Sequence, residues 1–237
     1  MNCPVTEADI KNAQEIFGES IQCLKGKMTR RPSIHARGIL VKIPDNILAS
    51  YANVTLSADV MAVNGVKFLV THLRHIRFTT SELLTSLHNN MLLEALLNIC
   101  KMYRKRGFMV RMMMMDGAFK SLRGALAEKH IEPNICSENK HVDEIERTNC
   151  TIKERCRGIY NTLPFTKLPG RIVAELVHST VFWINAFHPA EDLLDNMSPR
   201  TIITGRTINF LKHCKHEFGD YVQTHESTDN TMAPRTI

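Results

Sequence analysis

The chain has 237 residues, 43% of them hydrophobic and 23% charged, which is the composition of a globular protein with room for one well-cored domain and extensions. The formal charge of +6 favours polyanionic partners. The sequence has no run of about 18 or more apolar residues, so no membrane span is predicted. Seven cysteines without regular spacing, and an N-terminus without a basic–apolar–small cleavage pattern, predict an intracellular, reducing setting.

The N-terminal part predicts a short helix followed by a basic arm. Thr6 and Asp9 have the spacing of a helix-capping pair, so a helix is expected over residues 6–17. Residues 24–38, LKGKMTRRPSIHARG, are basic and have no sustained period, which predicts an extended linker. Four cations of this arm either contact nucleic-acid phosphates or are simply solvated: Lys25, Lys27, Arg30 and Arg31.

Strand patterns follow. Residues 53–63, NVTLSADVMAV, alternate at a period of two, and Asn64-Gly65 predicts a tight hairpin turn. Residues 66–80 return as one long or two short strands. A helix capped by Thr80 or Ser81 is then expected to run to about Lys105. Its apolar stripe would consist of Leu83, Leu84, Leu87, Met91, Leu96 and Ile99.

Residues 108–115, FMVRMMMM, are apolar on both faces apart from Arg111, which predicts a central strand covered on both sides. After it we expect a helix over 119–130, a short strand over 131–135, and helices over 143–162 and 168–187. The order β-β-β-α-β-α-β-α-α predicts an α/β fold with one mixed sheet and helices on both faces.

Three carboxylates occupy positions that such a fold could bring together. Asp59 lies in mid-strand, where aspartate is depleted, Asp116 directly follows the covered strand, and Glu146 lies near the start of the 143–162 helix. Each has a plainer explanation: a solvated edge-strand aspartate, an Asp-Gly turn and a solvated helical glutamate. Together they could hold two Mg²⁺ ions, which is the arrangement that cuts or joins phosphodiesters by in-line displacement.

Cations accompany the helical carboxylate. Lys153 and Arg157 follow Glu146 on one stripe of the predicted helix. A metal-binding carboxylate beside phosphate-binding cations suits a nucleic-acid site, whereas surface ion pairing is the plainer alternative. The predicted buried stripe of this helix consists of Ile145, Asn149, Ile152, Cys156 and Ile159. Periodicity does not choose between Glu146 and Glu144, which flank this stripe on opposite sides.

Several segments resemble, in the same order, the integrase core of copia-type LTR retrotransposons. They are FGESIQCLKGKMTR (17–30), LSADVMAVNGVKF (56–68), YRKRGFMVRMMMMDGAF (103–119), NKHVDEIERTNCTIKERCR (139–157), FWINAF (182–187) and SPRTIITGRTINFLKHCKHEFGDYVQTHE (198–226). The resemblance implies an RNase H-like fold with a catalytic, metal-binding triad at Asp59, Asp116 and Glu146. The choice of Glu146 follows the family's Glu-Arg pair, here Glu146-Arg147.

The resemblance also implies a function. The chain would be an integrase-type polynucleotidyl transferase that performs 3′ processing and strand transfer of retroelement DNA with Mg²⁺ or Mn²⁺. Its partners would be the element's ends and target DNA rather than a membrane, contacted by Arg147, Lys153, Arg157 and the four cations of the arm. An active protein would be a homo-oligomer in the nucleus or in a cytoplasmic particle.

The same resemblance divides the chain. Residues 1–50 would be a helix and linker ending the pre-integrase region, 51–188 the catalytic core, 189–226 a post-core segment and 227–237 a disordered tail. The zinc-binding region that precedes the core in the family is missing, so we expect a fragment of a decayed element or a reading frame cut from one.

Some residues depart from the family pattern. Ala118 replaces a common acidic residue, the gap from Asp116 to Glu146 is shorter than usual, and Asn149 and Cys150 stand where an apolar–basic pair is usual. Two other functions therefore stay open: a catalytically degenerate remnant that only binds nucleic acid, and a stand-alone RNase H-like nuclease.

Other metal-binding and nucleophilic candidates are weaker. A zinc site at His213, Cys214 and His216 is disfavoured because no partnering pair lies at suitable spacing. Three thiols near the predicted site lack a paired base or CxxC spacing, which predicts incidental or buried cysteines: Cys136, Cys150 and Cys156.

Overall fold

The computed structural model describes residues 4–22, 40–136, 143–187 and 197–220. The chain divides into two compact units, Ile39–Gly219 and a smaller one formed by Met1–Gly38 with Asp220–Ile237. The larger unit extends beyond residues 51–188 on both sides. The four cations of the basic arm and the 227–237 tail lie outside the described residues.

In the smaller unit, the described residues form the predicted N-terminal helix, α1 (Glu7–Phe17). Asp9 N donates to Thr6 Oγ1 at 3.3 Å, and Thr6 N donates to the Asp9 carboxylate at 2.8 Å, which completes the expected capping box. Hydrogen bonds from the Thr6 side chain and backbone lower the pKa of the Asp9 carboxyl. None of the α1 residues is buried.

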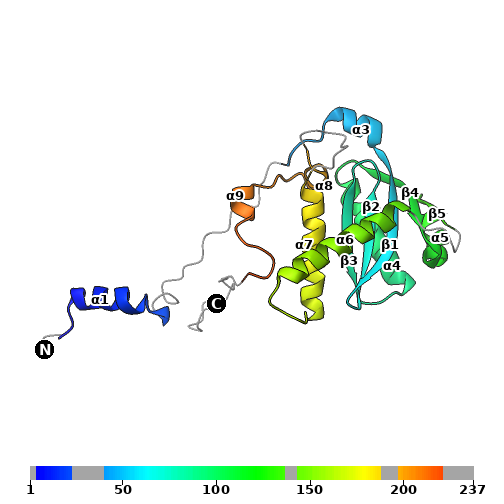
Figure 1. The fold of residues 1–237 in the computed structure, drawn as a ribbon. Coiled ribbons are helices and arrows are strands. Elements are labelled where there is room, and N and C mark those ends of the chain that lie inside the picture. The colour runs from blue at the N-terminus through cyan, green and yellow to red at the C-terminus, as the bar shows by residue number, and fades with distance from the viewer. Residues whose placement is uncertain (1–3, 23–39, 137–142, 188–196, 221–237) are drawn as a thin grey trace. The chain divides into compact units, whose positions relative to one another are not determined.

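The larger unit is built on a five-stranded mixed sheet (Figure 1). Its strands are β1 (Asn53–Val63), β2 (Val66–Leu73), β3 (Phe78–Leu84), β4 (Met109–Met115) and β5 (Glu132–Ile135), in the order β3-β2-β1-β4-β5. Strand β2 pairs antiparallel with both β1 and β3, whereas β4 pairs parallel with β1 and with β5. Asn64 and Gly65 adopt φ of 46° and 80°, as a two-residue hairpin turn requires. The predicted α/β fold with one mixed sheet is confirmed.

Helices cover both faces of this sheet. The helices described in the larger unit are α3 (Asp45–Tyr51), α4 (Asn89–Arg104), the 3₁₀ helix η1 (Gly117–Leu122), α5 (Arg123–Ala127), α6 (Asp143–Thr162), α7 (Gly170–Ala186), α8 (Pro199–Thr204) and α9 (Phe210–His213). In Figure 1, α6 and α7 lie in front of the sheet and α4 lies behind it. Within the described part of the chain, no helix is both long and apolar enough to cross a membrane.

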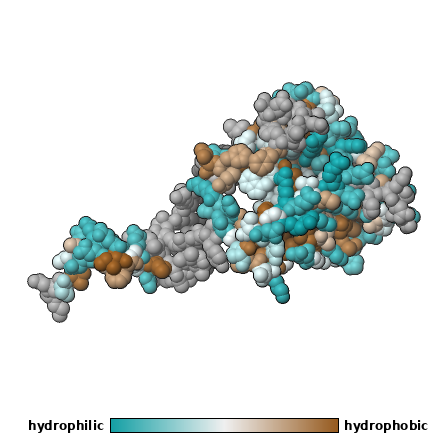
Figure 2. Space-filling view, in the orientation of Figure 1, coloured by the Kyte–Doolittle hydropathy of each residue, from teal (hydrophilic) through white to brown (hydrophobic). Residues whose placement is uncertain are grey.

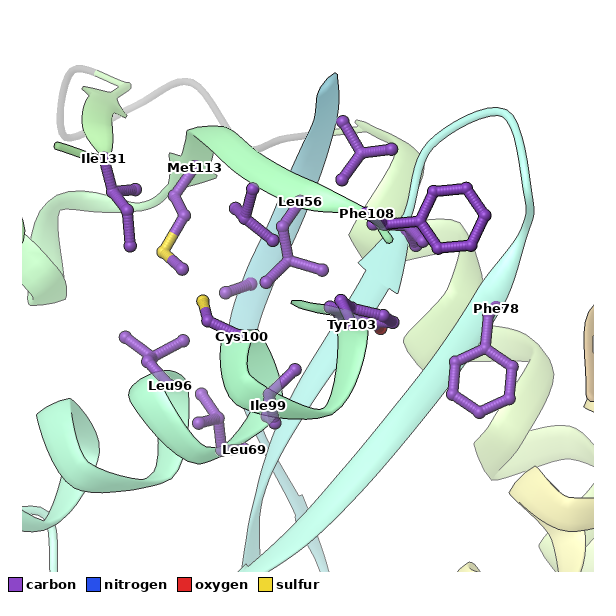
Figure 3. Close-up of a cluster of buried hydrophobic side chains, with 14 of the residues drawn as sticks. Leu56, Leu69, Phe78, Leu96, Ile99, Cys100, Tyr103, Phe108, Met113 and Ile131 are labelled. Atoms are coloured by element: carbon purple, nitrogen blue, oxygen red, sulfur yellow. The ribbon is translucent and has the colours of Figure 1, made fainter. Parts of the chain in front are cut away.

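Two hydrophobic clusters form, one on each face. The cluster beneath α4 includes Leu56, Leu96 and Met113 (Figure 3), and that beneath α6 and α7 includes Phe68 and Ile152. This division follows the period-two alternation of the strands. Strand β4 contributes to both clusters and lies between β1 and β5, so the methionine run is a covered interior strand as predicted.

The boundary between β3 and α4 differs from the prediction. Thr80 and Ser81, expected to cap a helix, are instead within β3, and α4 begins at Asn89. The β-branched Thr79 and Thr80 suit the strand, and Leu83 and Leu87 are exposed rather than part of a helical stripe. The helix expected over 119–130 is also replaced by η1 followed by the short α5.

Helix α8 is anchored to the main body of the larger unit. Arg106, in the turn before β4, donates from Nε to the Ile202 carbonyl at 3.0 Å and from Nη2 to the Val41 carbonyl at 2.8 Å. Val41 N in turn donates to the Gly205 carbonyl at 2.8 Å. With Ile202 and Ile203 buried in the α4-side cluster, these contacts explain why the compact unit continues past the end of α7.

Candidate active site

Asp59 projects from the middle of β1 toward α6. It belongs to the odd-numbered positions of the strand, which face the α6 side, and its side chain is half-buried. Val60 N donates to Asp59 Oδ1 at 2.7 Å, and Asn149 Nδ2 donates to Asp59 Oδ2 at 2.7 Å. Asp59 is therefore held in an interior strand and is not the solvated edge residue of the plainer explanation.

Asp116 follows directly after β4, which pairs in parallel with β1. The last pair in their register joins Ala58 to Met115, so Asp59 and Asp116 are the next residues on the two neighbouring strands. Asp116 also caps η1, because its Oδ1 accepts a hydrogen bond from Ala118 N at 3.0 Å. Asp116 therefore caps the local turn and also lies beside Asp59, so the turn explanation and a place in the carboxylate site are compatible.

Glu146 reaches the same place from the first turn of α6. This helix turns a stripe that includes Ile145, Asn149 and Ile152 toward the sheet, which leaves Glu146 on the exposed flank facing β4. Asp59, Asp116 and Glu146 all line one hollow of about 220 Å³, together with Asn149, Cys150 and Lys153 among others. The structure thus brings the three predicted carboxylates together.

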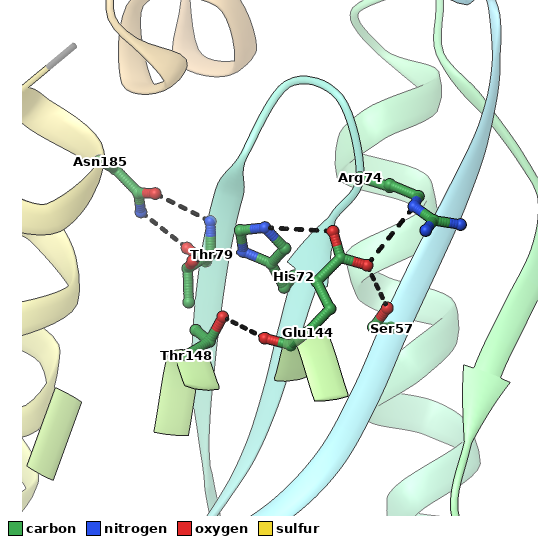
Figure 4. A network of polar contacts seen from close by, with 7 residues as sticks. All are labelled: Ser57, His72, Arg74, Thr79, Glu144, Thr148 and Asn185. Carbon is green, nitrogen blue, oxygen red and sulfur yellow. Dashed lines mark hydrogen bonds and ion pairs between the residues drawn. The ribbon is translucent and has the colours of Figure 1, made fainter. Parts of the chain in front are cut away.

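Glu144 lies on the other flank of α6 and enters a different network (Figure 4). Its carboxylate accepts a hydrogen bond from Ser57 Oγ at 3.3 Å and lies 3.6 Å from Arg74 Nε and 3.9 Å from His72 Nε2. Burial lowers the pKa of His72, an effect that Glu144 opposes and Arg77 reinforces. Of the two glutamates that periodicity could not separate, Glu146 lines the hollow with the aspartates.

The donor set suits a hard cation. Carboxylate oxygens are the ligands that Mg²⁺ and Mn²⁺ prefer, and three of them line one hollow. Among the described residues, however, no three His, Cys, Asp or Glu side chains are gathered closely enough to hold a metal ion. Both oxygens of Asp59 accept hydrogen bonds, and the Glu146 side chain is exposed.

The three predicted nucleic-acid-binding cations of α6 lie on two different flanks of that helix. Lys153 lines the carboxylate hollow, and with Arg157 it also lines an adjoining hollow of about 430 Å³ at the β1–β2 hairpin. Arg147 instead lines a hollow of about 600 Å³ on the opposite flank, beside Glu144. The exposed side of α6 is largely hydrophilic in Figure 2, as a ligand-binding or simply solvated helix surface would be.

The thiols do not form a reactive centre. Cys156 is buried and lies 3.3 Å from Thr180 Oγ1, and burial raises its pKa, so it is a protonated core residue. Cys136 is half-buried and Cys150 is exposed. Cys214 of the weak zinc candidate is exposed, and no described group of side chains there can hold a metal.

Sequence reasoning missed the partner of Asp59. Asn149 is 7% exposed, as its place on the predicted buried stripe implies, but no partner was predicted for it. Its Nδ2 reaches Asp59, whereas its Oδ1 is buried without a hydrogen-bond partner among the described residues. A polar residue within an apolar helical stripe was the available signal, because a buried amide requires a polar partner.

Similarity to known proteins is found among solved structures. No family model matches the sequence, and no curated protein is significantly similar to it. Among solved structures, the chain is similar to the catalytic core domain of BIV integrase, with 10% sequence identity and a TM-score of 0.44. The match covers 63% of this chain and 93% of that one.

Proposed function

We propose that the chain is a metal-dependent polynucleotidyl transferase of the integrase type, acting on DNA by 3′ processing and strand transfer. The observation that carries the proposal is the meeting of Asp59, Asp116 and Glu146, from three separate elements, in one hollow with Lys153. A lone carboxylate has many explanations, but three that converge from β1, the end of β4 and α6 beside a cation match what phosphodiester chemistry needs. The colinear resemblance to copia-type integrases supports the same conclusion.

In this proposal each side chain has a defined task. Asp59 and Asp116 would hold Mg²⁺ or Mn²⁺ from neighbouring strands, and Glu146 would complete the ligands from α6. When bound, such ions would activate an oxygen nucleophile and neutralise charge on the leaving oxygen. Asn149 orients the Asp59 carboxylate through its 2.7 Å hydrogen bond, and Lys153 would contact a substrate phosphate. The protein would work as a homo-oligomer in the nucleus or in a cytoplasmic particle.

Strand transfer from a terminal-repeat oligonucleotide in the presence of Mg²⁺ tests the proposal. Asp116→Asn and Glu146→Gln should abolish product formation while leaving salt-sensitive DNA binding largely intact. Asparagine can still cap η1, so Asp116→Asn removes charge without removing the local turn. The matched control is Glu154→Gln, an exposed position on α6 that should behave as wild type.

Two other functions predict different results. A degenerate remnant would bind DNA without any turnover, and the absence of a gathered metal cluster among the described residues is the observation in its favour. A stand-alone nuclease would cleave an RNA–DNA hybrid without joining strands. Strand transfer that is unaffected by both carboxylate substitutions would contradict the assignment of the site itself.

A further inference from the structure

A second hollow, of about 600 Å³, lies on the flank of α6 that faces away from the three carboxylates. The turn between β2 and β3, the first half of α6 and the C-terminal end of α7 line it. Four arginines contribute to the lining: Arg74, Arg77, Arg147 and Arg155. Two carboxylates stand among the described lining residues, Asp143 and Glu144, which leaves a formal charge of +2. We refer to this site as the arginine hollow.

Two of these arginines can receive an anion. The Glu144 carboxylate accepts a hydrogen bond from Ser57 Oγ and forms an ion pair with Arg74. Part of the negative charge in the hollow is therefore already paired. Neither Arg147 nor Arg155 forms an ion pair within the described part of the chain. They lie eight positions apart on α6, about 12 Å along the axis at 1.5 Å per residue. That separation allows them to contact different phosphates of one strand.

An exposed aromatic ring completes the hollow. Phe187, just after α7, lines it and is 52% exposed. The Phe187 ring is stacked against Phe210, with centroids 6.2 Å apart and planes at 28°, and its centroid lies 6.1 Å from that of Trp183. Because these two rings already restrict its motion, the Phe187 side chain loses little further conformational freedom when a flat ligand stacks on it. Cations beside an exposed aromatic ring are the features that bind single-stranded nucleic acid.

We propose that the arginine hollow binds a single-stranded nucleic-acid segment, with phosphates on Arg147 and Arg155 and an unpaired base on Phe187. The inference rests on the proposed function, since the strand would belong to the nucleic acid on which the carboxylate site acts. A duplex has no free base face to offer Phe187. An acidic peptide would satisfy the arginines but would gain no stacking contact from the ring.

Fluorescence anisotropy of a labelled short oligothymidylate with the full chain, measured over a salt series, tests the inference. Arg147→Gln combined with Arg155→Gln should lower the slope of log K against log salt concentration by about 1.4, at about 0.7 per lost phosphate contact. The matched control is Arg104→Gln with Arg123→Gln, exposed positions on α4 and α5, which removes the same charge outside the hollow and should leave the slope unchanged. An equal effect of both pairs would overturn the proposal.

The ring is tested separately. Phe187→Ala should weaken oligothymidylate binding between about 5-fold and about 100-fold without changing the salt slope, and Phe187→Leu should weaken it comparably while keeping apolar packing. Trp183, the sole tryptophan, lies on the same aromatic row, so its fluorescence reports both folding of the variants and strand binding. Unchanged affinity in both Phe187 variants would overturn the stacking assignment.

The outcome is separable from that of the proposed function. If no strand transfer occurs but binding is lost only in the hollow variants, the proposed function fails and this inference stands. If strand transfer occurs and the hollow variants bind and react as wild type, this inference alone fails. Displacement of the oligothymidylate by polyglutamate at equal charge concentration would identify an acidic-peptide site and overturn the proposal.

Discussion

Replacing Asn185 with leucine should destabilise the larger unit, because this side chain clamps the edge strand β3 to α7. Its Oδ1 accepts from Thr79 N at 2.8 Å and its Nδ2 donates to the Thr79 carbonyl at 2.7 Å (Figure 4). Thr79 is 1% exposed, so neither backbone group can turn to bulk water when the amide is lost. Each unsatisfied buried group costs about 1–3 kcal/mol, and two give about 2–6 kcal/mol. That loss is a large part of the 5–15 kcal/mol of stability typical of a domain.

Urea denaturation followed by circular dichroism measures this effect. Leucine keeps an apolar side chain in the space, so the loss reports hydrogen bonds rather than a large cavity. Asn185→Asp would break only one of the two hydrogen bonds, because it retains an acceptor for Thr79 N but presents no donor to the Thr79 carbonyl. The matched control is Asn98→Leu on the exposed side of α4, expected to change the free energy of unfolding by about 0.5 kcal/mol or less. A loss below about 1 kcal/mol for Asn185→Leu would refute the reasoning.

Three further substitutions test other parts of the structure. Burial lowers the pKa of His72 from 6.5, so the folded state favours the neutral imidazole more than the unfolded state does. The stability gained from this is fully present above about pH 6.5 and is lost as the pH falls toward the folded-state pKa. His72→Gln should flatten this part of the urea-midpoint profile, and an unchanged slope would contradict the assignment. Ile152→Ala, at a fully buried position beneath α6, should cost about 2–5 kcal/mol in the same urea assay, and a smaller loss would argue against tight packing there. Asn149→Ala removes the amide's hydrogen bond to Asp59 Oδ2 and should weaken Mn²⁺ binding about 10- to 100-fold by titration calorimetry, whereas unaltered affinity would show that the amide has no orienting role.

Elements with an uninterrupted period were predictable from the sequence. Strand β1 and helix α6 have the bounds expected for them, because alternation at two and a buried stripe at 3.6 are properties of the chain itself. The start of α4 was not predictable in this way. Leu83 and Leu84 fit a helical spacing, yet tertiary contacts with α7 keep this stretch in an edge strand. Packing by a helix nearly a hundred residues later overrides the local pattern.

The site was predictable to the level of its residue types. Asp59 was conspicuous because aspartate is unusual within a strand, and the element order brought it beside Asp116. The choice between Glu144 and Glu146 depended on which flank of α6 faces β4, and a helical period does not contain that information. The network of Ser57, His72 and Glu144 joins three elements through ordinary residues, none of which departs from its local pattern.

The bulge between β1 and β4 has a consequence for comparing related chains. Val54 pairs with Val110 and Thr55 with Met112, so Arg111 is an extra residue that the ladder passes over. A chain lacking this one residue could pair without interruption and still hold Asp59, within β1, beside Asp116 at the end of β4. An alignment should therefore accept a single-residue gap at Arg111, inside a strand where gaps are ordinarily penalised. A motif search that fixes the number of residues between the two aspartates would reject chains that place these two aspartates in the same way.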